Sequence, residues 1–139
     1  MSKTFVKSIA TLEIPVARIE PAVEWYTRIL GFQVLHQTAT DAMLRLGEEA
    51  SPSAPRLYLV AAASPDRLFF LNNDTGVTHG IIDFYVSELE EFHLFLKNHE
   101  VSVTAVHYFN GSNGVGGFGF SDLDGNHFGA TNVVELQDC

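Results

Sequence analysis

The chain has 139 residues, of which 46% are hydrophobic and 18% are charged, a composition typical of one ordinary globular domain. Acidic residues outnumber basic ones by 17 to 8, and the net charge of −9 argues against nucleic acid or an anionic membrane as a partner. A cationic small ligand and a solvated acidic surface both fit this charge. The one cysteine, Cys139, excludes an internal disulfide and favours a cytoplasmic location, and no stretch resembles a signal peptide or a membrane span.

The first predicted elements are a strand and a helix. An apolar run of about eight residues begins at Leu12 and predicts the strand. Pro21 suits the first helical position, because its φ is fixed and it has no N–H to satisfy. Gly31 suits the left-handed residue that ends the helix. The apolar stripe of this helix comprises Ala22, Tyr26, Ile29 and Leu30. Strands are then expected at about 33–38, 42–47 and 56–62.

The second half of the chain repeats the first. The segment LEIPVARIEPAVEWYTRILGFQV, from Leu12, has its counterpart in IDFYVSELEEFHLFLKNHEVSV, from Ile82. Ser87 and Glu90 predict a capping box at the start of a second helix, which should end near His99. Its apolar stripe comprises Leu89, Phe92, Phe95 and Leu96. Strands are expected at about 103–108, 116–121 and 127–133.

Two connecting segments carry local signals. Residues 63–78 are rich in turn residues and are predicted to link the two copies. The apolar run 68–71 within this linker either packs on a core or forms a short helix, or it lines a dimer contact or a pocket rim. In SDLDGNHFGATN, from Ser121, Asp122 and Asp124 can accept bonds from the backbone that follows them, and Gly125 can take positive φ. This predicts a structural hairpin turn rather than a calcium loop.

The chain resembles the vicinal oxygen chelate superfamily, which contains glyoxalase I, bleomycin-resistance proteins and extradiol dioxygenases. The motifs that carry the resemblance are IPVARIEPAVEWYTRILGF (14–32) and FGFSDLDGNHFG (118–129), together with the repeat. The resemblance implies an α+β fold in a single domain, built from two βαβββ modules in tandem at about 1–65 and 75–139. Curved mixed sheets are then expected around a cavity, and such chains commonly form homodimers.

The resemblance also implies where a metal would bind. Metal-dependent members place His, Glu or Gln on the first strand of each module and a carboxylate on a last strand. Here these positions hold Thr11, Ile81 and Gly129, so we expect no metal and no cofactor. His79 and His127 lie two residues before Ile81 and Gly129. If their strands are antiparallel, the two histidines are about 13 Å apart, too far for one ion.

Equivalent positions in the two copies hold Glu13 and Asp83. If both point into the cavity, one pKa is raised and the pair can act as acid and base, and they can also receive a cationic group. If this face points outward, each acid simply bonds nearby polar groups. The glycine-rich loop 107–119 is either a lid, with Tyr108 and Phe109 closing the cavity, or a wide hairpin. The residues predicted to bind a ligand are Thr11, Glu13, Ile81, Asp83, Tyr108, Phe118, His127 and Gly129.

Three functions are compatible with these observations. The first is a metal-free protein that binds a small ligand, as bleomycin-resistance proteins do, and the acidic charge is compatible with a cationic ligand. The second is a lyase- or oxygenase-like enzyme with a non-standard site around Glu13 and Asp83. The third is an interaction module whose cavity is filled by its own side chains, since the chain has 11 phenylalanines.

Overall fold

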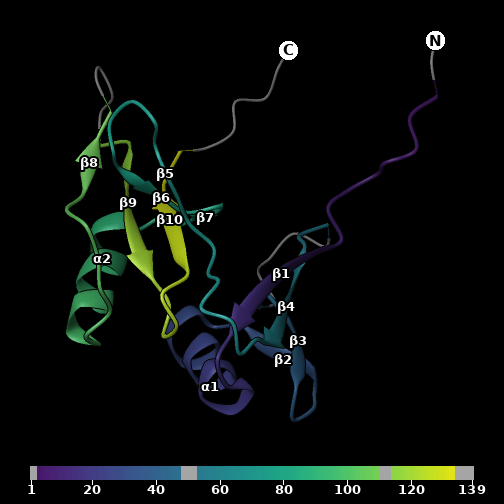
Figure 1. Ribbon diagram of the computed structural model, residues 1–139. Helices are drawn as coiled ribbons and strands as arrows, with labels where there is room; N and C mark the ends of the chain where they lie inside the picture. The colour runs from purple at the N-terminus through teal and green to yellow at the C-terminus, as the bar shows by residue number, and fades with distance from the viewer. Residues whose placement is uncertain (1–2, 48–52, 110–113, 134–139) are drawn as a thin grey trace. The chain divides into compact units, whose positions relative to one another are not determined.

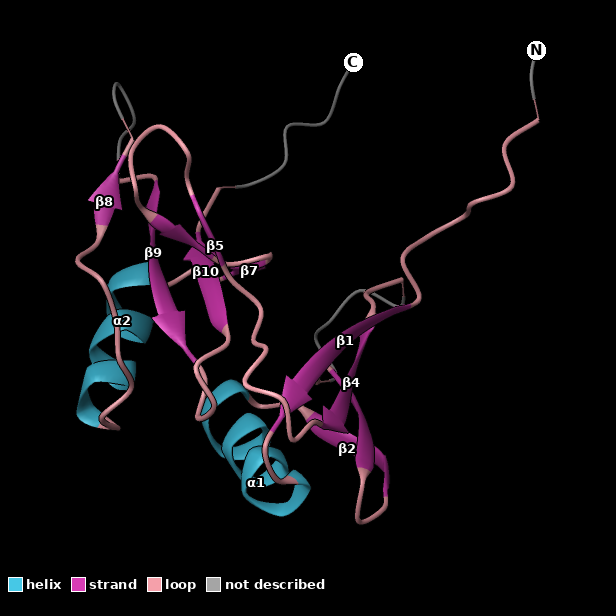
Figure 2. Ribbon diagram, viewed as in Figure 1, coloured by secondary structure: helices cyan, strands magenta, loops and turns pink. Residues whose placement is uncertain are grey.

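The computed structural model of the chain describes residues 3–47, 53–109 and 114–133, so Cys139 lies outside the described residues. The chain divides into two compact units, Met1–Asp66 and Arg67–Cys139 (Figure 1). Each unit contains one helix and a four-stranded mixed sheet (Figure 2), which confirms the two predicted βαβββ modules. In the described part of the chain, no helix is both long and apolar enough to cross a membrane.

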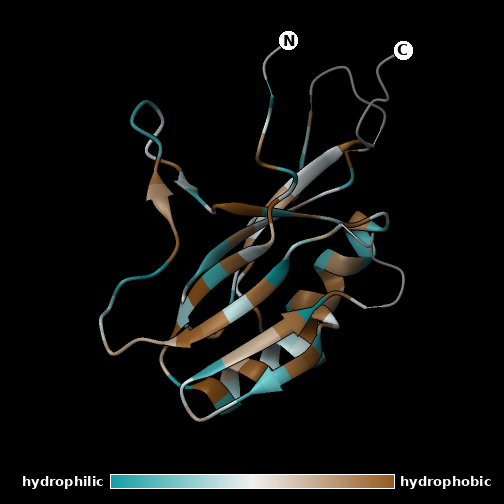
Figure 3. Cartoon of the chain, turned by 90° about the vertical axis from the view of Figure 1, so that its right-hand side faces the viewer, coloured by the Kyte–Doolittle hydropathy of each residue, from teal (hydrophilic) through white to brown (hydrophobic). Residues whose placement is uncertain are grey.

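The first unit is built from β1 (Thr11–Val16), α1 (Ile19–Leu30), β2 (Gln33–Gln37), β3 (Asp41–Arg45) and β4 (Arg56–Ala61). The sheet order is β1-β4-β3-β2, in which β1 is parallel to β4 and the other neighbours are antiparallel. Alternate strand residues such as Ile14, Leu44 and Leu59 are fully buried. Figure 3 shows this alternation as apolar and polar segments that follow one another along the strands.

Helix α1 begins earlier than Pro21 predicts and ends where Gly31 predicts. It starts at Ile19, so Pro21 is its third residue, still within the first turn, where N–H groups have no helical partner. Gly31 has a φ of 77°, and the N–H of Phe32 donates to the carbonyl of Tyr26 at 3.2 Å. This is the left-handed termination that glycine favours.

The second unit repeats the topology of the first. Its main elements are β7 (Ile82–Tyr85), α2 (Leu89–Asn98), β8 (His107–Tyr108), β9 (Gly116–Ser121) and β10 (His127–Thr131). The sheet order is β7-β10-β9-β8, and β7 is again parallel to the last strand. Phenylalanine rings pack between α2 and the sheet with centroids 5.4 to 6.2 Å apart, and they belong to Phe84, Phe92, Phe118, Phe120 and Phe128.

The predicted capping box at α2 is wrong. The helix begins at Leu89, and the preceding residue, Glu88, makes no side-chain capping bond. The carboxylate of Glu90 instead accepts a hydrogen bond from the hydroxyl of Tyr108 on β8. Glu90 therefore bonds to a residue that is distant in the sequence, rather than to the backbone at the start of its own helix.

The predicted strand at 103–108 forms only in part. Val103 makes an isolated bridge to Phe120, and regular pairing is confined to His107 and Tyr108. The reason lies at Thr104, whose Oγ1 accepts the N–H of Gly119 at 2.8 Å. A side chain takes the place of a backbone acceptor there, which interrupts the regular ladder.

The linker contains a short hairpin. Strands β5 (Phe70–Leu71) and β6 (Thr78–His79) pair antiparallel, so the apolar run is not a short helix. The linker joins the second unit, because the N–H of Leu68 donates to Asn126 Oδ1 at 2.8 Å and Arg67 Nε donates to the carbonyl of Asp124 at 3.0 Å.

The predicted hairpin turn between β9 and β10 is confirmed, and side-chain hydrogen bonds stabilise it. Asp122 Oδ1 accepts the N–H groups of Asp124 and Asn126 at 2.8 and 2.9 Å, and Gly125 has a φ of 92°. The buried amide of Asn126 donates to Asp122 Oδ2 at 2.8 Å. These bonds fix the position from which β10 starts.

Candidate functional site

Two grooves lie along the sheet of the second unit. Their volumes are about 560 and 660 Å³, within the range of about 300–1,000 Å³ that is usual for small-molecule sites. Both are open grooves rather than enclosed cavities. The residues that line both are His79, Asp83, Phe118 and Gly129. Asp83 and Gly129 therefore lie where the two grooves meet.

Asp83 and Gly129 are neighbours across two strands, and the side chain of one fills the space beside the other. They are direct partners in the parallel pairing of β7 and β10. Asp83 Oδ1 occupies the space that the Cβ of any larger residue at position 129 would take. The carboxylate of Asp83 thus lies over the position at which the resemblance described above would place a metal-binding carboxylate.

The face around this pair has few side chains. In β9, Phe118 and Phe120 contact Phe92 of α2, so the alternate residues of this strand face the other way. Gly119 is one of these, and it pairs directly with Gly129 on β10. The bare backbone at Gly119 therefore forms a floor beside the carboxylate of Asp83.

Two histidines flank the floor, each held by an aromatic ring of the linker. His127 lies 5.3 Å from Phe69 in a T-shaped contact, and His79 stacks on Phe70 at 5.2 Å. These contacts place the apolar linker run against two residues that line the groove, and a pocket rim stays one of the alternatives predicted for it. His127 Nδ1 is 3.4 Å from Ser121 Oγ.

The tautomer of His79 follows from its partner Asn72. Asn72 Oδ1 accepts the N–H groups of Asp74 and Thr75 at 2.8 and 3.1 Å, which orients the amide. Asn72 Nδ2 is then the group that lies 3.1 Å from His79 Nε2. Because Nδ2 can only donate, Nε2 accepts, and the ring proton is on Nδ1.

The predicted geometry of the two histidines is wrong. Strands β7 and β10 are parallel, not antiparallel, so the separation of about 13 Å has no basis. His79 also lies on β6 rather than on β7, and Gly80, between these strands, lies close to the backbone of His127. His79 and His127 line the same groove.

The other predicted ligand residues lie in several places. Thr11 and Glu13 are on β1 of the first unit, where Glu13 is exposed and pairs in register with Tyr58. Ile81 is 59% exposed and directly precedes β7. Glu13 and Asp83 therefore occupy equivalent strands of different units.

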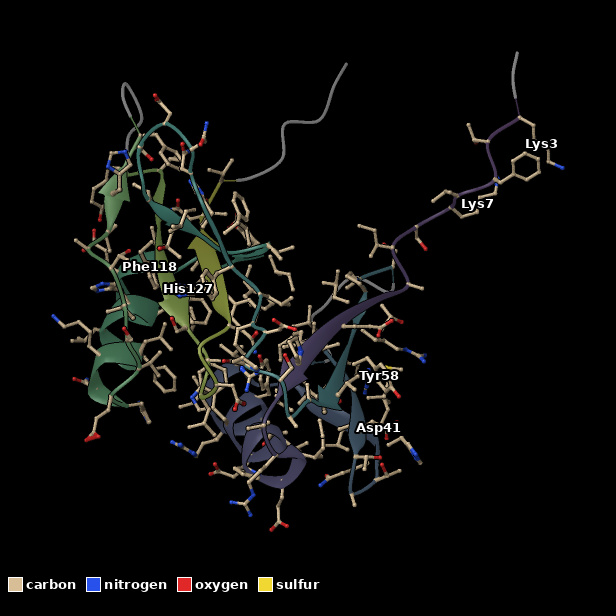
Figure 4. The ribbon with its side chains drawn as sticks, in the orientation of Figure 1. Lys3, Lys7, Asp41, Tyr58, Phe118 and His127 are labelled. Carbon is tan, nitrogen blue, oxygen red and sulfur yellow. The ribbon has the colours of Figure 1, made fainter. Side chains whose placement is uncertain are left out.

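Tyr108 and Phe118 both have partners on the helix side of the second sheet. The hydroxyl of Tyr108 donates to Glu90, and this bond raises the pKa of Tyr108. Phe118 borders both grooves, but its ring packs on His93 at 4.7 Å. Phe118 and His127 lie on neighbouring strands (Figure 4). Among the described residues of the loop that follows β8, Phe109 lines the second groove.

The first unit carries a polar cluster on the sheet face of Glu13. Tyr58 donates to Asp41 Oδ2 at 2.5 Å, and Thr38 donates to Asp41 Oδ1 at 2.7 Å (Figure 4). The bond from Tyr58 and then that from Thr38 hold the pKa of Asp41 below its usual value. The same bond, with burial and the charges of Asp41 and Glu13, raises the pKa of Tyr58.

Sequence reasoning missed several residues that line the grooves. Gly119, Thr104 and Ser121 were not predicted as site residues, although all three line the first groove. The alternation in GGFGFS contains a signal for Gly119, since a strand that places phenylalanines on one face places the intervening residues on the other. Thr104 carries no such signal, because its position depends on the irregular pairing of residues 103–108.

Comparison with models of known protein families shows the superfamily of the chain. The family model described as "Glyoxalase/Bleomycin resistance protein/Dioxygenase superfamily" matches residues 8–129. The chain belongs to this superfamily. No curated protein sequence matches the chain as a relative.

Solved structures of the glyoxalase type share its fold. A lactoylglutathione lyase from Agrobacterium tumefaciens is 18% identical with a TM-score of 0.65, covering 91% of this chain and 93% of its own. TioX from Micromonospora sp. ML1 is 18% identical with a TM-score of 0.65, covering 92% and 100%. TnmS3, an antibiotic binding protein from Streptomyces sp. CB03234, is 18% identical with a TM-score of 0.67, covering 93% and 98%. At this identity the likeness concerns the fold alone.

The divalent metal of metal-dependent superfamily members does not fit the residues present. Thr11, Ile81 and Gly129 stand where the resemblance implies the ligands, and Ile and Gly side chains have no donor atom. Among the described residues, no group of three or more His, Cys, Asp or Glu side chains is arranged to hold a metal ion. Among the described residues that line them, the grooves instead offer one carboxylate, two imidazoles and hydroxyls such as those of Thr104 and Ser121.

Proposed function

We propose that the chain is a metal-free, small-molecule-binding protein of the glyoxalase/bleomycin-resistance type, with its ligand on the grooved face of the second unit. The observation that supports this is the carboxylate of Asp83 over Gly129, where the two grooves meet. The role of Asp83 is to receive a cationic or hydrogen-bond-donating group of the ligand.

The charges of the grooves favour a cation. Among the described residues that line them, Asp83 is the only carboxylate, and no lysine or arginine is present. Asp83 is exposed, so it is open to a ligand. The net charge of −9 further favours the approach of a cation over that of an anion.

Thermal unfolding with a panel of cationic antibiotics tests the proposal. A ligand present at 100 times its Kd stabilises the folded state by about 2.7 kcal/mol, a shift that is easily measured. Asp83→Asn should weaken binding by about 10- to 100-fold, because a charge-assisted hydrogen bond is lost. Asp74→Asn is the matched control, since it removes the same charge from an exposed turn of the same unit. Equal binding by both variants would contradict the role of Asp83.

Metal content tests the metal-free part of the proposal. Elemental mass spectrometry on untagged protein, purified without chelator, should find less than about a tenth of an equivalent of zinc, nickel, manganese or iron, because the ligand positions lack donors. About one equivalent that is retained after gel filtration would overturn this part.

Two further expectations stay predictions. Catalysis by Glu13 and Asp83 would require turnover of a methylglyoxal–thiol adduct or a catechol that disappears in Glu13→Gln. A homodimer would require a light-scattering mass of twice the chain's 15.3 kDa.

A further inference from the structure

We propose that the groove selects flat, conjugated cations, and that Gly119 is the position that determines this selectivity. The inference rests on the proposed function, because it names the class of ligand that the same site takes. The supporting observation is that position 119 has no side chain, although the fold has room for one there.

Gly119 has no structural reason to be glycine. It lies inside strand β9, where glycine has no side chain to pack and weakens the strand. Its φ is not positive, whereas Gly31, Gly76, Gly114 and Gly125 have positive φ. A Cβ at position 119 would meet Thr104 Cγ2 at 3.6 Å and the carbonyl oxygen of Phe128 at 3.7 Å, which are ordinary contacts.

Other glycines of the same sheet differ from Gly119 in this respect. A Cβ at Gly117 would come within 2.6 Å of the carbonyl oxygen of Ala130, and one at Gly129 would collide with Asp83. Packing against backbone therefore explains Gly117, and the carboxylate of Asp83 fills the space over Gly129. The space above Gly119 stays available for a molecule that approaches the backbone closely.

The surroundings of Gly119 suit a flat molecule with one charged end. One row across the sheet runs from Asp83 through Gly129 and Gly119 to Thr104, and neighbouring strands are about 4.8 Å apart. The row thus has the carboxylate of Asp83 over Gly129 at one end, a threonine at the other and bare backbone at Gly119 between them. One ring of a flat aromatic system can lie on the bare backbone at Gly119, next to the carboxylate, while a bulky saturated cage of the same charge meets less surface.

Polar side chains frame the floor on both sides along the strands. His127 and Ser121 form the next pair on this face in one direction, and Thr131 pairs with Gly117 in the other. Ring nitrogens and hydroxyls at the edges match the edge heteroatoms of a conjugated ligand better than they match a purely hydrocarbon guest.

Two monovalent cations of different shape test the inference on the full chain. The flat probe is 9-aminoacridine, and the cage-shaped probe is 1-aminoadamantane. Calorimetric titration of each, at one pH and one salt concentration, is done with the wild type, Gly119→Val, Gly119→Ala, Asp83→Asn and Gly47→Ala. Gly47 is a matched control glycine in the first unit, where a Cβ would meet only the carbonyl oxygen of Gly31 at 3.8 Å.

We expect 9-aminoacridine to bind the wild type about tenfold or more tightly than 1-aminoadamantane. Gly119→Val should weaken 9-aminoacridine binding by about tenfold or more, because its methyl groups fill the space above the floor. Gly119→Ala should have a smaller effect, and Gly47→Ala none. The alanine variant keeps the test valid if the valine variant fails to fold.

Three outcomes would count against the inference in different ways. If both cations bind equally and both are lost in Asp83→Asn, flat selectivity is overturned while the proposed function stands. If 9-aminoacridine binds Gly119→Val as well as the wild type, the role of Gly119 is overturned. If neither cation binds at millimolar concentration, or if Asp83→Asn changes nothing, the inference and the cationic form of the proposed function both fail.

Discussion

Asp83 on β7 and Gly129 on β10 are cross-strand partners in which the carboxylate of one occupies the side-chain space of the other. The atom that would collide with a residue larger than glycine is Asp83 Oδ1, the end of a flexible side chain. A substitution at position 129 can therefore be accommodated by rotation of Asp83. The same rotation moves the proposed ligand anchor.

Gly129→Ala should weaken ligand binding with little change in the stability of the protein. We expect the free energy of unfolding to change by less than about 1 kcal/mol, because Asp83 can rotate away. Binding of 9-aminoacridine should weaken about as much as in Asp83→Ala, because the carboxylate has moved. In the double variant the two effects on binding should not add, since both act through one group. Urea denaturation and calorimetric titration measure the two quantities, and additive losses of binding would contradict the coupling.

The turn at Asp122 and Asn126 should account for a large part of the second unit's stability. Asn126 is fully buried, donates to Asp122 Oδ2 and accepts from Leu68 N–H, each at 2.8 Å. Asn126→Ala should lower the free energy of unfolding by about 2–4 kcal/mol, because it leaves buried partners unsatisfied. Asn73→Ala, at an exposed turn residue, is the control. Urea denaturation followed by circular dichroism measures both, and a cost below about 1 kcal/mol for Asn126→Ala would contradict this role.

The bond between Tyr58 and Asp41 should make stability depend on pH at both extremes. The folded pKa of Asp41 is lowered, so its contribution is present above the unfolded carboxyl pKa of about 3.9 and is lost as pH falls through the lower folded value. The folded pKa of Tyr58 is raised, so its contribution is complete below about pH 10 and is lost as pH rises through the higher folded value.

Tyr58→Phe removes this bond and provides the test. The difference in the free energy of unfolding between wild type and variant should be largest between about pH 5 and 9 and should shrink toward both extremes. Tyr85→Phe, at a tyrosine that is 59% exposed, is the matched control for the loss of a phenolic hydroxyl. Urea denaturation at a series of pH values measures both. A constant difference for Tyr58→Phe would contradict the assignment.

Much of the fold could be predicted because its signals are local. The repeat starting at Leu12 and Ile82, the glycine that ends α1 and the Asp-rich turn each depend on a few neighbouring residues. The errors arose where a distant partner replaces a local one. Glu90 bonds to Tyr108 rather than to its own helix start, and Thr104 Oγ1 replaces a backbone acceptor in the ladder.

The candidate site depended on strand register, which the sequence did not supply. Strand alternation placed Asp83 and Gly129 each on one face of its own strand, but it did not show that they are partners. The assumption of antiparallel strands set His79 and His127 about 13 Å apart, whereas the parallel pairing of β7 and β10 places both along one groove. The carboxylate that Gly129 lacks could therefore be located only from the pairing.

The end of α2 offers a way to stabilise the second unit without touching the grooves. Glu100 has a φ of 61° and occupies the place in the second copy that Gly31, with a φ of 77°, occupies in the first. The left-handed conformation costs a non-glycine residue about 1 kcal/mol, and glycine adopts it without that cost. Glu100→Gly should therefore raise the free energy of unfolding by up to about 1 kcal/mol, despite the greater freedom of glycine in the unfolded chain.

Glu91→Gly, inside the same helix, is the opposite control and should lower the free energy of unfolding by about 1 kcal/mol. Urea denaturation of the two variants measures both changes, and a loss of stability in Glu100→Gly would show that the Glu100 side chain contributes more than its backbone strain costs.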